Sequence, residues 1–226
     1  FDSATPGTVV TIGPITGLQG DETILGIDVR PATGQIYALG STGRLYILNR
    51  TTAAATFAAS VSATLSGTAF GVDFNPTVDR LRVISSTGQN LRINPNDGVT
   101  ITDGAINGPT TSVDAGAYIS NLFDISAATD TLYTQIPPNN GTLVAVGPLG
   151  VNASDANGFD FSSDNGVAYA ALTVEGTTGL YTINTTTGAA TLVGAIGAGT
   201  GGVRGLAADI GSTPGYTAVG LTTANQ

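Results

Sequence analysis

Apolar and polar residues alternate along this chain in runs of about five residues, which is typical of half-buried β-strands. Turn-forming glycine, asparagine, aspartate and proline separate the runs. Apolar residues nowhere recur at helical spacing over three turns, so we expect almost no helix. Strand pairs joined by tight turns are predicted at Gln35–Gly40 with Arg44–Asn49, Leu81–Ser85 with Asn90–Asn94, Leu122–Ser126 with Thr131–Gln135, and Val167–Leu172 with Gly179–Asn184.

One strand-like element recurs five times along the sequence. Its copies are Gly26-Ile27-Asp28-Val29, Gly71-Val72-Asp73-Phe74, Gly116-Ala117-Tyr118-Ile119, Gly158-Phe159-Asp160-Phe161 and Gly205-Leu206-Ala207-Ala208. The intervals between them are 45, 45, 42 and 47 residues. An interval of this length is typical of a β-propeller blade with four short strands.

A second element ends each unit. Thr8–Pro14 resembles Thr142–Pro148, and Thr191–Gly197 is a third copy. The fifth unit retains only Gly205–Ala208 and Tyr216–Leu221 before Gln226. We therefore expect an all-β, five-bladed β-propeller of four-stranded antiparallel blades, the last blade being shared between N- and C-terminal strands. The expected blades of this single domain are residues 26–70, 71–115, 116–157, 158–204, and 205–226 with 1–25.

Composition narrows the class of protein. Seven arginines, no lysine and 16 acidic residues give a net charge of −9, which argues against nucleic acid or an anionic membrane as a partner. A run of about 18 apolar residues is missing, so no membrane insertion is expected. Because Phe1 is not a start methionine, we expect a processed chain that has lost a signal peptide. The absence of cysteine favours a bacterial surface or medium over a eukaryotic secretory route.

The sequence resembles a family of secreted bacterial proteins known only as a domain of unknown function, number 4394. The resemblance is most specific at Asp73–Arg80 and Asn139–Val144, and it extends over Phe1–Gly17, Gly26–Leu48, Gly71–Gly104, Thr131–Pro148 and Val203–Ile210. It implies an exported, propeller-like protein and brings no activity, cofactor or catalytic residue with it. One departure is the short connection between Asn121 and Leu122, where members tend to carry an extra loop.

Several kinds of chemistry lack the residues they need. Without histidine, cysteine or lysine the chain offers no Ser-His-Asp triad, thiol nucleophile, Schiff base or common zinc or iron site. No catalytic residue and no cofactor are therefore predicted, and we expect a protein that is not an enzyme.

Three aspartates are the weak candidates for a metal site. Asp28, Asp73 and Asp160 occupy the same position of the repeated element, on the strand that lines the channel of a propeller. They could form a cation site or a glycosidase-like acid and base pair. The interpretation we favour is that each aspartate accepts backbone N–H bonds and joins one blade to the next. Tyr118 and Ala207 interrupt the series.

Two other groups of polar residues are interpreted as structural. Asn94–Gly98 and Ser162–Gly166 are oxygen-rich, but neither has the spacing of a calcium-binding loop, and plain hairpin turns are expected. Arg80, Arg82 and Arg92 could bind an anion, although surface pairing with Asp79 or Asp97 is favoured.

The divided last blade suggests a structural protein that assembles with copies of itself. The predicted assembly residues are Thr8, Val9, Val10, Thr11 and Ile12 on one side and Tyr216, Val219 and Leu221 on the other. If the N-terminal strand of one chain completed the last blade of the next, a filament would result. The alternatives are a module that binds surface glycan or protein, and an aspartate- and metal-dependent hydrolase.

Overall fold

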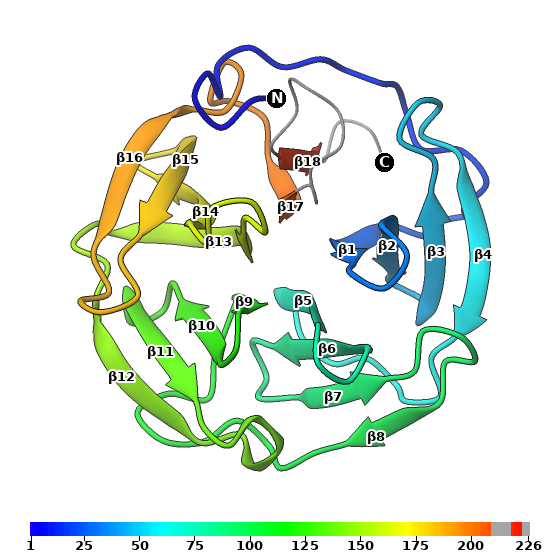
Figure 1. Cartoon of the computed structure of the whole chain (residues 1–226), viewed down its shortest axis with the longest axis horizontal. Helices are drawn as coiled ribbons and strands as arrows, with labels where there is room; N and C mark the ends of the chain where they lie inside the picture. The colour runs from blue at the N-terminus through cyan, green and yellow to red at the C-terminus, as the bar shows by residue number, and fades with distance from the viewer. Residues whose placement is uncertain (209–217, 223–226) are drawn as a thin grey trace.

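The structure is a computed structural model that describes residues 1–208 and 218–222. Its described part is built from β-sheets arranged as blades around a central axis, with one 3₁₀ turn, η1, at Pro138–Asn140 (Figure 1). The propeller expected from the sequence is therefore confirmed. The predicted scarcity of helix is confirmed for these residues as well.

Four sheets each contain four antiparallel strands that follow one another from the axis outward. The first contains β1 (Ile24–Arg30), β2 (Gln35–Gly40), β3 (Arg44–Leu48) and β4 (Ala55–Ser60). The second contains β5 (Phe70–Asn75), β6 (Arg80–Ser85), β7 (Asn90–Ile93) and β8 (Thr100–Thr102). The third contains β9 (Ala115–Tyr118), β10 (Leu122–Ser126), β11 (Thr131–Gln135) and β12 (Leu143–Pro148). The fourth contains β13 (Ala153–Phe161), β14 (Ala168–Val174), β15 (Thr177–Ile183) and β16 (Ala190–Ala195).

The fifth copy of the repeat forms a smaller sheet. It pairs β17 (Val203–Ala208) with β18 (Ala218–Thr222), and no other described strand joins it. The structure thus has four four-stranded blades, and the prediction of five is wrong. Of the expected C-terminal assembly residues, Val219 and Leu221 lie in β18 opposite Ala207 and Gly205, whereas Tyr216 lies outside the described residues.

The N-terminal segment is not the strand that the repeat predicted. Residues 8–14 form no ladder with any described strand, so the closing strand expected at Thr8–Pro14 is absent and the last blade is not shared in the way expected. The segment crosses the outer rim of the ring between β16 and β4 (Figure 1). It is held at its ends, where the Pro6 carbonyl accepts the Gly197 N–H and the Thr16 carbonyl accepts the Ala55 N–H.

The core lies between neighbouring sheets. Tyr37 and Phe74 meet edge to face across the first and second sheets, with ring centroids 5.4 Å apart. Phe123 and Phe161 meet across the third and fourth sheets at 5.8 Å. Because β17 also packs between β13 and β1, through Leu206 among others, the innermost strands form a closed ring. The ring places the first strand of every repeat around one channel.

Candidate functional site

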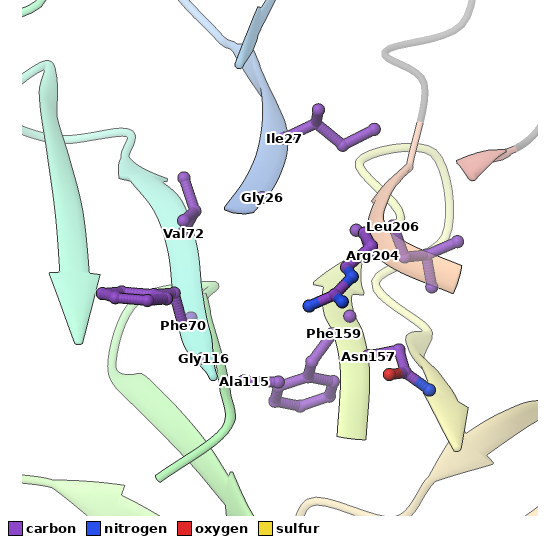
Figure 2. A pocket seen from close by; sticks show the side chains of 13 residues that line it. Gly26, Ile27, Phe70, Val72, Ala115, Gly116, Asn157, Phe159, Arg204 and Leu206 are labelled. Carbon is purple, nitrogen blue, oxygen red and sulfur yellow. The ribbon is translucent and has the colours of Figure 1, made fainter. Parts of the chain in front are cut away.

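The glycine of each repeat forms one mouth of the central channel. A Cβ atom on Gly158 would lie 2.5 Å from the backbone nitrogen of Leu206, and one on Gly71 would lie 2.6 Å from that of Gly116. Such contacts are too short for any side chain, so only glycine lets the inner strands approach this closely. The cavity left at this mouth is about 10 Å³, enough for a single water molecule. Figure 2 shows the Arg204 side chain extending into the opening.

The three predicted aspartates meet two residues farther along the same strands. One carboxylate oxygen of each of Asp28, Asp73 and Asp160 lies within 4.8 Å of the others, and all three residues are buried. Sequence position alone thus placed three carboxylates from three different sheets at one point of the channel.

Each of these aspartates also joins two sheets. Asp28 Oδ2 accepts the N–H of Phe74 at 2.6 Å, and Asp28 Oδ1 accepts the N–H of its neighbour Val29 at 2.6 Å. Asp73 Oδ2 accepts the Tyr118 N–H at 2.8 Å. These hydrogen bonds agree with the role favoured from the sequence, in which each aspartate joins one blade to the next.

Asp160 repeats this arrangement at the fourth sheet. Its Oδ2 accepts the Ala208 N–H of β17 at 2.6 Å, and its Oδ1 accepts the Phe161 N–H at 2.6 Å. The junctions between β9 and β13 and between β17 and β1 have no such aspartate, because Tyr118 and Ala207 stand at the equivalent positions. Three of the five junctions between inner strands therefore carry the aspartate bond.

Burial raises the pKa of all three carboxyl groups, and repulsion from neighbouring carboxylates raises it further for Asp28 and Asp73. Burial raises the pKa of Asp28 well above its usual value, and the charge of Asp160 raises it further. The pKa of Asp73 is raised by burial first and then by Asp28 and Asp160. For Asp160, burial raises the pKa to about 7 even though the N–H groups of Ala208 and Phe161 favour the charged form. The site can accept protons or a cation.

A cavity of about 240 Å³ opens above the carboxylates, on the side away from the glycine mouth. Its walls combine apolar side chains with a few polar ones. The lining includes Pro31, Phe74, Pro76, Ile119, Phe161 and Ser162. Pockets that bind small ligands commonly combine such walls with a small polar centre.

The two loops weighed as calcium sites are hairpin turns. Asn94 Oδ1 accepts the Asn96 N–H, and Asp97 Oδ1 accepts the Val99 N–H. In the other loop Asn165 Oδ1 accepts the Val167 N–H. These oxygens hold the turns in place, in agreement with the interpretation favoured from the sequence.

The arginines do not form the pairs expected. Arg82 and Arg92 both bind Asp103, at 2.7 and 2.6 Å, in place of Asp79 or Asp97. Asp79 instead pairs with Arg30 at 2.5 Å, and Arg80 donates to the backbone carbonyls of Val78 and Asp79. Arg82 is buried and also donates to Asn90, Asn139 and Tyr118, so it joins the second and third sheets.

The structure contains a fourth buried aspartate, Asp124, that the sequence did not lead us to predict. Asp124 is fully buried on β10, and both of its carboxylate oxygens lack a hydrogen-bond partner in the described structure. It stands opposite Tyr133, nine residues later, as Asp28 stands opposite Tyr37. This spacing is the signal that could have found it. Because β9 takes the innermost position, Asp124 lies on the second strand of its sheet, opposite Gly116.

A family model described as Domain of unknown function (DUF4394) matches residues 1–207. The chain belongs to this family. The resemblance stated from the sequence is thereby confirmed. A search of curated proteins found no match. In the described part of the chain, no helix has the length and apolar character needed to span a membrane.

Two solved structures are similar to this member of the DUF4394 family. One is a Bacteroides thetaiotaomicron VPI-5482 protein of unknown function, with a TM-score of 0.56 and 17% identity over 70% of this chain. The alignment spans 44% of that protein. The other is the glutaminyl cyclase of Myxococcus xanthus, with a TM-score of 0.54 and 15% identity over 88% of this chain and 85% of the enzyme. At these identities the likeness shows the fold alone.

Proposed function

We propose that this protein is an extracellular, non-catalytic structural protein that assembles into filaments. In the assembly, the N-terminal segment of one chain completes the fifth sheet of the next chain. The observation that carries the proposal is the difference between residues 8–14 and the other two copies of the same motif. Those copies are the outermost strands β12 and β16, which pair along their length with β11 and β15.

The segment has the properties of a strand that lacks its partner. Val9, Val10 and Ile12 are 47%, 58% and 47% exposed, similar to Val144 in β12 (53%) and Leu192 in β16 (57%). Their exposure is therefore that of an outermost strand, and what the segment lacks is the ladder to a neighbouring strand. On the other side, β18 has one edge without a described partner. An added strand would gain main-chain hydrogen bonds with β18, and such bonds are the main source of affinity when a strand is added to the edge of a sheet.

Few hydrogen bonds have to break when the N-terminal segment moves from its own ring to a neighbouring ring. The segment is attached to its own ring at its ends, through Pro6 and Thr16, and a neighbouring ring offers the same end contacts. Domain swapping of this kind therefore costs little, because the contacts that are lost are made again on the partner. A head-to-tail contact that does not close on itself continues into a fibre.

The non-catalytic part of the proposal is supported by the bonding of the channel aspartates. The carboxyl groups of Asp28, Asp73 and Asp160 each accept a backbone N–H from the adjacent inner strand. The extracellular part is supported by the resemblance to exported proteins and by a chain without cysteine.

Electron microscopy and light scattering of the purified 226-residue chain test the proposal. Wild-type protein should form filaments, and a Val10→Asp, Ile12→Asp double variant should remain at the mass of one chain, 22.4 kDa. Val78→Asp is the matched control, since Val78 is 52% exposed in the turn between β5 and β6. Wild-type protein that consists of single-chain rings at every concentration would refute the proposal.

A further inference from the structure

Four buried oxygen atoms of the third sheet have no hydrogen-bond partner in the described structure. They are both carboxylate oxygens of Asp124, the hydroxyl of Ser126 and the amide oxygen of Gln135. All three residues are 0% exposed, so bulk solvent does not reach these oxygens. A buried polar atom without a hydrogen bond is costly, and folded proteins contain few of them. Four such atoms in one sheet indicate that a small bound molecule supplies the missing bonds.

The strand register puts the three side chains on one face of the sheet. Asp124 and Ser126 are two residues apart on β10, and Gln135 lies diagonally across from Asp124 on β11. In an antiparallel sheet, positions related in these two ways point to the same side. This face packs against the second sheet, because a Cβ on Gly116 would lie 2.9 Å from Asp124 Oδ1 and 2.6 Å from Ile84 Cδ1.

The spacing of the three residues suits bridges of one water molecule. Residues two apart on a strand are separated by about 6.6 Å, and diagonal neighbours on adjacent strands by about 7–8 Å. Two hydrogen bonds through one water oxygen span up to about 5.6 Å. The side chains themselves cover the remainder of each gap, so one water molecule reaches from Asp124 to Ser126 and another reaches from Asp124 to Gln135.

The chemistry of the four atoms favours water over a metal ion. The carboxylate of Asp124 and the amide oxygen of Gln135 only accept hydrogen bonds, and water is a donor. The site has a single carboxyl group, and Arg82 of the second sheet already brings a positive charge to it, so a cation would be repelled. Water also suits both protonation states of Asp124, because it can donate to a carboxylate or accept from a carboxylic acid.

From these observations we propose that two ordered water molecules bind between the second and third sheets. One joins Asp124 to Ser126, and the other joins Asp124 to Gln135. A buried water molecule makes about three hydrogen bonds to polar groups that would otherwise lack partners, and its removal is costly. The two molecules therefore hold the Asp124 side chain in place and link β10 to β11. This site does not depend on filament assembly.

A high-resolution crystal structure of the 226-residue chain tests the site. One water molecule should lie within about 3.2 Å of both Asp124 and Ser126, and another within about 3.2 Å of both Asp124 and Gln135. A bound atom with oxygen distances near about 2.4 Å would identify a metal ion and overturn the proposal. Oxygens that are bound by protein donors, or that have no density between them, would overturn it as well.

Ser126→Ala tests the same site in solution. If the hydroxyl binds water, its removal should lower the melting temperature by roughly 2–4 °C, because Asp124 loses part of its hydrogen bonding. If the hydroxyl has no partner, its removal should leave the melting temperature unchanged or raise it, and either result would contradict the proposal. Ser163→Ala is the matched control at an exposed position after β13 and should melt with wild type. Should Ser126→Ala fail to fold, the wild-type crystal structure still decides.

Discussion

Replacing Asp124 with asparagine should change how stability depends on pH. Asp124 is fully buried and neither carboxylate oxygen has a described partner. Burial raises its pKa well above the usual value of 3.8, and the charge of Arg82 offsets only part of that effect. The carboxyl group is therefore harder to ionise in the folded chain than in the unfolded chain.

The direction in which stability changes with pH follows from the number of protons that the folded and unfolded states bind at Asp124. Above pH 4 the folded state binds more protons than the unfolded state at this group. The contribution of Asp124 to stability is complete below pH 4 and is lost as the pH rises toward its folded pKa, by about 1.4 kcal/mol per pH unit. The asparagine side chain of the variant does not titrate. The stability of Asp124→Asn relative to wild type should therefore rise with pH at that slope.

Urea unfolding between pH 4 and pH 8 measures this difference. The Asp124→Asn variant is compared with wild type at each pH, so that contributions from other carboxylates cancel. Val78→Thr, at an exposed position of the turn between β5 and β6, serves as the control, and its stability difference from wild type should not change with pH because neither side chain titrates. A constant difference between Asp124→Asn and wild type over the whole range would refute the account of Asp124.

Two further predictions concern packing and buried charge. Gly158→Ala should destabilise the protein by about 1–3 kcal/mol in urea unfolding, because the added Cβ would lie 2.5 Å from the backbone nitrogen of Leu206. The control Gly20→Ala should be nearly neutral, because a Cβ there would have no atom within 4 Å. Equal losses of stability in the two variants would contradict the packing argument. Arg82→Met should cost about 3–5 kcal/mol in the same assay because it leaves buried Asp103 without one of its two cations. Arg80→Met, which removes bonds to backbone carbonyls, should cost less than about 1 kcal/mol, and a reversed order would contradict the assignment of Arg82.

The sequence predicted the local elements well because alternation and turn residues act over short distances. The strands Gln35–Gly40, Leu122–Ser126 and Thr131–Gln135 have the predicted bounds. The glycine of the predicted turn at Asn96-Asp97-Gly98 has a φ of 74°, as a tight turn of this kind requires. Because Asp28 and Asp73 occupy the same position of the repeat, the sequence also predicted that their carboxyl groups lie close together.

The errors concern partners that are distant in sequence. Thr8–Pro14 has the composition of an outer strand, but composition does not reveal whether a neighbouring strand is present to pair with it. Asp103 became the partner of Arg82 and Arg92 because β7 and the chain after β8 meet there, which no local pattern records. Asp124 was missed because the repeat was aligned on Gly116, eight residues earlier, although Asp124 has the same spacing to Tyr133 as the channel aspartates have to their partners.

Energy transfer between two labelled populations tests the central claim most directly. The chain has no cysteine, so one population can carry a donor dye at Thr8→Cys and the other an acceptor dye at Thr222→Cys. If the segment completes a neighbour's fifth sheet, transfer should grow as the mixed populations assemble. A reference sample consists of chains that carry both dyes, one at each position. Energy transfer in this reference sample and none in the mixture would show that each ring closes on its own segment, and it would contradict the account.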